Sequence, residues 1–139
     1  MQIVKNKRFV AYSNEEVTQL KPHPDKIYVF DLDGTMCNIK HRLHHILVDR
    51  SKGEKKNFPE FYRAVPNDLP IEEIVALNQV LPAENIYLIT GRSMECVDDT
   101  KEWLAKHGIR WSRLYMRWHH NFEHDVDLKR HMADEFIEN

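Results

Sequence analysis

Two short runs of continuously apolar residues most constrain what this chain can fold into, because each run ends abruptly in polar residues. Ile27 to Phe30 precedes Asp31, and Ile86 to Ile89 precedes Thr90. Apolar runs of this length, rich in β-branched and aromatic residues, are typical of strands buried on both faces of a parallel sheet. Segments of helical periodicity follow both runs. The sequence therefore predicts an α/β fold, a parallel sheet flanked by helices.

The remaining elements follow from periodicity and from helix-breaking residues. Helices are expected from about Pro70 to Leu81, from Met94 to His107 and from Val126 to Glu138, with a third strand at Leu114 to Met116. Asp68 is a candidate cap for the first of these helices. Residues 37–67 show no regular pattern and predict short helices in a long excursion.

Length and composition favour one ordinary globular domain. The chain has 139 residues, of which 42% are hydrophobic and 30% charged, and no apolar run approaches the roughly 20 residues that cross a bilayer. Two cysteines are too few for a disulfide framework, so a cytoplasmic protein with reduced thiols and no membrane contact is expected. The expected division is an N-terminal extension, residues 1–26, with two short strands and a helix, followed by the main domain, residues 27–139.

The polar residues after the two apolar runs carry the functional signal. In a parallel sheet the carboxyl ends of the strands meet at one edge, where ligands bind. The segments there are Asp31-Leu32-Asp33-Gly34-Thr35 and Ile89-Thr90-Gly91-Arg92. They resemble the first two motifs of the haloacid dehalogenase superfamily, and residues 31–129 more narrowly resemble the 3′-phosphatase domain of polynucleotide kinase-phosphatases.

The resemblance implies a Rossmann-like haloacid dehalogenase fold with a small or absent cap, and it assigns catalytic roles. Asp31 is the nucleophile, whose acyl-phosphate water hydrolyses in a second step. Asp33 protonates the leaving oxygen and then takes a proton from the attacking water. Thr90 donates a hydrogen bond to the phosphoryl oxygens. Lys129 resembles the third-motif lysine, which offsets the charges of the aspartate and the phosphate.

Further residues are expected to bind the substrate. The backbone around Leu32 forms a nest for phosphoryl oxygens, and a glycine allows the tight turn that makes it. Arg92 is a candidate fork-shaped clamp on phosphate. The substrate-binding set is Leu32, Gly34, Thr35, His41, Arg42, Gly91, Arg92 and Arg117. Of the tryptophans, Trp118 is the better candidate for stacking on a base, since Trp103 fits the apolar face of its helix.

Magnesium is the cofactor that the resemblance implies, with Asp31 and the backbone carbonyl of Asp33 as ligands. The family takes further ligands from an acidic pair on a strand that follows Lys129, and the sequence shows no such strand, so the fold is expected to be incomplete at the C-terminus. Three accounts stay open. The chain is a truncated product, a second chain or a homo-oligomer completes the sheet, or the segment from Arg8 to Tyr12 fills the gap, with Asp125, Asp127 or Asp98-Asp99 as substitute acids.

The leading functional hypothesis is Mg-dependent removal of a phosphate from the 3′ end of a nucleic acid during end repair. A nucleoside monophosphate phosphatase with the same chemistry is one alternative. The other is a protein that binds phosphate or nucleic acid without catalysis, because it has lost metal ligands. The net charge of −2 excludes a densely basic nucleic-acid-binding protein, so contact with a polynucleotide must be local.

Overall fold

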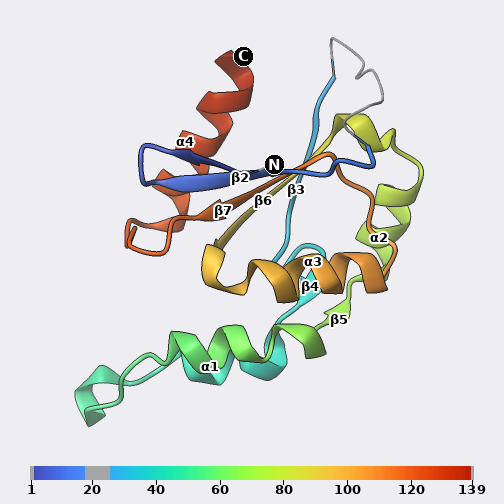
Figure 1. Cartoon of the computed structure of the whole chain (residues 1–139). Coiled ribbons are helices and arrows are strands. Elements are labelled where there is room, and N and C mark those ends of the chain that lie inside the picture. The colour runs from blue at the N-terminus through green and yellow to red at the C-terminus, as the bar shows by residue number, and fades with distance from the viewer. Residues whose placement is uncertain (1, 18–25, 139) are drawn as a thin grey trace.

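The computed structural model describes residues 2–17 and 26–138. Its main sheet has the strand order β1-β2-β7-β6-β3 (Figure 1). The strands are β1 (Gln2–Lys5), β2 (Phe9–Ser13), β3 (Tyr28–Asp31), β6 (Ile86–Ser93) and β7 (Arg113–Arg117). β3, β6 and β7 are parallel, as the apolar runs predict, whereas β2 joins β7 and β1 joins β2 in antiparallel fashion.

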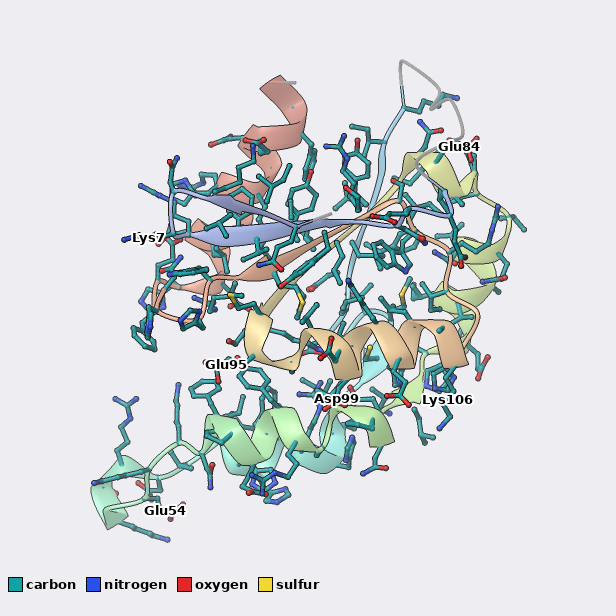
Figure 2. All side chains as sticks on the ribbon, in the orientation of Figure 1. Lys7, Glu54, Glu84, Glu95, Asp99 and Lys106 are labelled. Carbon is teal, nitrogen blue, oxygen red and sulfur yellow. The ribbon has the colours of Figure 1, made fainter. Side chains whose placement is uncertain are left out.

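Helices cover both faces of this sheet (Figure 1). α4 (Asp125–Glu138) lies on one face, and α2 (Glu72–Gln79) and α3 (Val97–Lys106) lie on the other. Successive residues of a strand point to opposite faces, so Leu114 and Met116 enter the core beneath α3 while Tyr115 packs against α4. Side chains fill the space on both sides (Figure 2). The predicted α/β fold, with parallel strands flanked by helices, is confirmed for β3, β6 and β7.

The excursion between β3 and α2 forms a small projecting arm, residues 39–68. At the base of the arm, two short antiparallel strands pair with each other, β4 (Cys37–Asn38) and β5 (Leu69–Pro70). The arm holds η1 (Lys40–His45), η2 (Arg50–Lys52), α1 (Phe58–Arg63) and η3 (Val65–Asn67), so the predicted short helices are present. Two further short turns are η4 (Ala83–Asn85) and η5 (Met94–Cys96). The side chain of Asp31, at the sheet edge, remains 31% exposed beside this arm.

Two predicted boundaries are wrong for physical reasons. Ile71, not Asp68, caps α2, because the Asp68 carboxylate is buried among arginine side chains. β6 continues past Thr90 to Ser93, because a bulge restores its pairing with β7. In the N-terminal extension both predicted strands form. The predicted helix lies partly on residues 18–25, outside the described residues, and the described part, residues 15–17, is a turn.

The N-terminal segment does not fill the gap beside β3. β2 pairs with β7, on the opposite side of the sheet from β3. It lies there because Phe9 extends the core under α4 while Val10 and Tyr12 extend the core under α3. Within residues 2–17 and 26–138, β3 has β6 as its single neighbour, and Val29, on the face that carries α4, remains 43% exposed.

No helix in the described part of the chain is long and apolar enough to span a bilayer.

Candidate active site

The carboxylate of Asp31 lies at the tip of β3 and is held from two sides. The backbone N–H of Leu32 donates to its Oδ1 at 2.8 Å, and Lys129 Nζ on α4 donates to its Oδ2 at 3.0 Å. The side chain of Asp31 is 31% exposed, so it is open to solvent on one side. Residues 98 positions apart in the chain thus meet at the sheet edge.

A tight turn follows Asp31 and fixes the start of the arm. The Leu32 carbonyl accepts hydrogen bonds from the backbone N–H groups of Thr35, Met36 and Cys37, and the side chain of Leu32 is fully buried. Gly34 has φ of 82°, in the left-handed region that glycine adopts without steric cost. In this turn Gly34 is exposed and Thr35 is half-buried. Contact of the backbone N–H groups of the turn with a phosphoryl group stays a prediction.

Two arginines converge on one oxygen of Asp33. Arg42 Nη2 donates to Oδ1 at 2.9 Å, and Arg92 reaches the same oxygen with Nε at 2.8 Å and Nη2 at 2.6 Å. No described residue hydrogen-bonds to Oδ2. The arginines therefore fix the orientation of the carboxylate and leave its second oxygen free to exchange a proton.

Asp68 is the site residue that sequence reasoning missed. Its buried carboxylate accepts from Arg42 Nε and Nη2, both at 2.8 Å, and from Arg92 Nη2 at 3.2 Å. His41 Nε2 lies 2.6 Å from the same carboxylate. Burial disfavours the charge of Arg92, but the groups around it, Asp33 first among them, together outweigh burial, so the pKa of Arg92 lies above its ordinary value. Two guanidinium groups and two carboxylates thus form a charge-balanced cluster, in which Arg42, Arg92 and Asp68 are buried and Asp33 is partly exposed.

Several predicted substrate-binding groups already have partners in this cluster. Arg42 and Arg92 are buried, and each donates from Nε and Nη2 to the carboxylates of Asp33 and Asp68. The Arg42 guanidinium also lies 4.3 Å from the Phe61 ring centroid. Direct contact of the two arginines with a substrate stays a prediction. The sequence analysis names Asp68 only as a candidate helix cap, and the resemblance of residues 31–129 does not indicate its burial.

A bulge in β6 brings the second motif to the same edge. Ile89 pairs with Tyr115 and Ser93 pairs with Arg117, so Thr90, Gly91 and Arg92 lie opposite the single residue Met116. Bulges re-aim side chains near functional sites. Here the bulge buries Thr90, whose Oγ1 accepts from the Arg92 N–H at 3.1 Å.

Contacts around Gly91 connect the end of β6 to Lys129 on α4. Arg117 Nε donates to the Gly91 carbonyl at 2.9 Å, and its Nη2 donates to Asp125 Oδ1 at 2.6 Å. Asp125 Oδ2 lies 3.7 Å from Lys129 Nζ. Arg117, on β7, thus contacts both β6 and α4. A continuous series of contacts leads from Arg117 through Asp125 and Lys129 to Asp31.

Comparisons with known proteins identify the family and a structural neighbour of this chain. The model of the family described as the polynucleotide kinase PNKP phosphatase domain matches residues 25–139. The chain belongs to this family. A chain of the solved structure titled "Structure of Pnkp1/Rnl/Hen1 complex" superposes with a TM-score of 0.61 at 22% identity, covering 82% of this chain and 35% of that chain. The protein therefore spans about a third of that neighbour's length. No curated protein sequence matches it.

Gly91 of this PNKP-type domain is expected to tolerate no side chain. A Cβ there would lie 2.3 Å from Asp125 Oδ1, and Asp125 cannot easily move while Arg117 holds it. We expect Gly91→Ala to lower the free energy of unfolding by about 1–3 kcal/mol, the usual cost of overpacking. Chemical denaturation measures it. The added substitution Asp125→Ala should recover part of the loss, and strictly additive effects would show that no clash exists.

One acidic group in the PNKP-type site has ligand atoms close enough to hold a metal ion. Asp33, Cys37 and Asp68 place one such atom each within 4.8 Å of one another. The arginines already occupy both oxygens of Asp68 and one oxygen of Asp33. Burial raises the pKa of the Cys37 thiol to about 12, so the thiolate that metals bind is absent at neutral pH. These residues do not fit a cation. Asp31, which is partly exposed and carries oxygen donors, fits Mg²⁺ better.

The buried Cys37 thiol predicts a loss of stability in alkali. Its pKa rises from 9.0 to about 12 on folding, so between these values the unfolded chain binds fewer protons than the folded one and stability falls as the pH rises. From pH 8 to 10 this contributes about 1 kcal/mol. Denaturation of wild type and Cys37→Ala across this range measures the effect. The variant should lose less stability, and equal losses would contradict the assigned burial.

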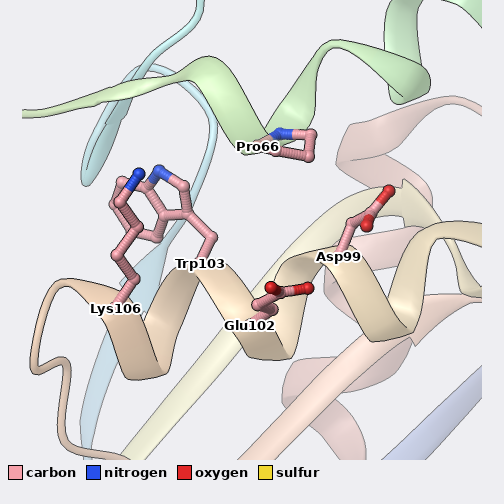
Figure 3. A pocket seen from close by; sticks show the side chains of 5 residues that line it. All are labelled: Pro66, Asp99, Glu102, Trp103 and Lys106. Carbon is pink, nitrogen blue, oxygen red and sulfur yellow. The ribbon is translucent and has the colours of Figure 1, made fainter.

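A separate depression of about 270 Å³ lies on the outer side of α3 (Figure 3). Its lining residues are Pro66, Asp99, Glu102, Trp103 and Lys106. Trp103 is largely buried and donates from Nε1 to the Asp68 carbonyl at 2.9 Å, so it supports the arginine cluster from behind. The depression shares no residue with the predicted site. Asp98-Asp99, on α3, likewise lies apart from the contacts around Asp31.

Proposed function

We propose that this domain hydrolyses phosphomonoesters through an aspartyl-phosphate on Asp31, and that its substrate is the 3′-phosphorylated end of a nucleic acid. The observation that carries the proposal is the meeting of Asp31 with Lys129 at the tip of β3, beside the arginine-held Asp33. Membership of the PNKP phosphatase family supports the substrate class.

The chain's own residues supply each part of the reaction. A carboxylate oxygen of Asp31 attacks phosphorus while the bond from phosphorus to the leaving oxygen breaks, and the free Oδ2 of Asp33 gives that oxygen its proton. Water then attacks the acyl-phosphate and loses a proton to Asp33, which releases phosphate and regenerates Asp31. Lys129 offsets the negative charge that gathers at Asp31.

Mg²⁺ is the proposed cofactor, with Asp31 and the backbone carbonyl of Asp33 as its protein ligands. Oxygen donors of this kind suit Mg²⁺, which also keeps several waters. When bound, the ion supplies positive charge that attracts the phosphate and offsets its charge. Asp125 is a further acid within the same connected site, through Lys129.

The open side of β3 supports a partner strand in this proposal. An edge strand presents unpaired N–H and C=O groups, which a further strand satisfies. β3 carries Asp31 and is paired on one side within the described residues, and Val29 beside it is exposed. A second chain, or a second copy of this chain, that pairs with β3 would cover Val29 and enclose the nucleophile.

Substrate preference tests the proposal. Phosphate release is measured with Mg²⁺ or EDTA from a 3′-phosphorylated oligonucleotide, the same oligonucleotide phosphorylated at its 5′ end, and nucleoside monophosphates. We expect metal-dependent release that is fastest from the 3′ end. Faster release from free nucleotides would favour a nucleotide phosphatase. Binding of the oligonucleotide without release from any substrate would favour a protein that binds and does not hydrolyse.

A further inference from the structure

The turn between β1 and β2 lies at the same edge of the sheet as the proposed active site. β2 runs antiparallel to β7 and pairs Phe9 with Arg117, so the start of β2 meets the carboxyl end of β7. Asn6 and Lys7 have φ of 53° and 56° and form the tight turn. This hairpin lies outside the residues that match the PNKP family model, so the family resemblance assigns it no role.

Hydrogen bonds fix the hairpin against the loop that follows β7, residues 118–124. The Arg8 carbonyl accepts from the Trp118 N–H at 3.1 Å and from Asn121 Nδ2 at 2.9 Å. Arg117 Nη1 holds the same loop through the carbonyls of Asn121 and Glu123. Contacts therefore connect Asp31 through Lys129, Asp125 and Arg117 to the hairpin.

The surface built by these two segments is cationic and carries an exposed ring. Lys7 and Arg8 are both exposed, and Arg8 Nη1 contacts the His131 ring. Figure 2 shows Lys7 at the outer end of the hairpin. Phe122, in the loop of residues 118–124, is 88% exposed. Trp118, the stacking candidate from sequence, packs partly into the core instead. Glu123 is the acidic residue of this loop, and its carboxylate pairs with Asn121 and His131.

We propose that Lys7, Arg8 and Phe122 bind the single-stranded nucleic acid that leads to the 3′-phosphate at Asp31. Cations that contact backbone phosphates and an aromatic ring that stacks on a base are the usual components of such a track. β2 lies three strand spacings from β3, or about 14 Å. At about 3.4 Å per stacked nucleotide the track spans about four nucleotides. The inference rests on the proposed function, since the phosphate at Asp31 fixes the direction of the strand.

Length-dependent binding tests the track. Fluorescence anisotropy in EDTA measures the affinity of the full chain for 3′-phosphorylated oligonucleotides of one, two, four and six nucleotides. In the wild type, affinity should rise up to about four nucleotides and then level off. The triple variant Lys7→Ala, Arg8→Ala, Phe122→Ala should lose about tenfold in affinity for the hexanucleotide, and most of the length dependence.

A matched variant and a salt titration sharpen the result. Lys55→Ala, Phe58→Ala removes an exposed cation and an exposed ring from the projecting arm instead, and it should bind as the wild type does. Loss of two phosphate contacts should reduce the slope of log affinity against log salt by about 1.4 in the triple variant. A loss in the arm variant alone, or no length dependence in the wild type, would overturn the track.

These outcomes separate the track from the proposed function. Hydrolysis of 3′-phosphates with equal binding by the wild type and the triple variant would refute the track and leave the phosphatase standing. The opposite outcome is also distinct. If the chain releases no phosphate from any substrate, but shows length-dependent binding that the triple variant loses, the phosphatase proposal is refuted and the nucleic-acid track stands.

Discussion

Asp31→Asn is expected to reduce phosphate release by at least about a thousandfold, because a neutral amide is a far weaker nucleophile than the carboxylate that attacks phosphorus in the proposed reaction. The amide keeps the shape of the side chain and can still accept from the Leu32 N–H, so the fold should remain. Steady-state release from the 3′-phosphorylated oligonucleotide measures the effect, and circular dichroism checks the fold.

Asp134→Asn is the matched control for this substitution. Asp134 is an exposed acid on α4, the helix that carries Lys129, and its substitution changes the net charge by the same amount. The control should retain wild-type turnover. Activity of Asp31→Asn within about tenfold of wild type would show that another group attacks phosphorus.

Asp68→Asn is expected to lower the free energy of unfolding by about 3–5 kcal/mol, the cost of breaking a buried ion pair. Both guanidinium groups of the cluster are buried, and without the Asp68 charge they share the single carboxylate of Asp33. Chemical denaturation of the wild type, Asp68→Asn and the control Asp134→Asn measures the effect. The surface variant should change stability by less than about 0.5 kcal/mol.

The same substitution separates stability from catalysis. Arg42 and Arg92 orient Asp33, so a folded Asp68→Asn variant should also release phosphate more slowly at saturating substrate. Unchanged turnover together with the expected loss of stability would make the cluster purely structural. A loss of stability no larger than that of Asp134→Asn would contradict the buried pairing.

The strand tips and their motifs were predictable from the sequence because each depends on neighbours in the chain. Ile27 to Phe30 is apolar and ends at Asp31, and the carboxyl edge of a parallel sheet follows from that pattern. Lys129 was placed by resemblance, and the structure brings it to Asp31.

The arginine cluster could not be predicted, because it depends on burial rather than on spacing. The sequence suggests that Asp68 is a helix cap, yet its carboxylate is buried at the end of the arm, where Arg42 and Arg92 contact it. The position of β2 in the sheet could not be predicted either, since a short apolar segment can extend either edge of a sheet. Its pairing with β7 is decided by the two cores that Phe9 and Val10 continue.

The most direct test of the central claim is to trap the covalent intermediate. The protein is mixed with an oligonucleotide carrying a radiolabelled 3′-phosphate, quenched in acid within one turnover, and digested for peptide mapping. The account predicts label on the peptide that contains Asp31, released by hydroxylamine as an acyl-phosphate is, and no label on Asp31→Asn. Rapid hydrolysis with no protein-bound label at any quench time, or label on another residue, would contradict it.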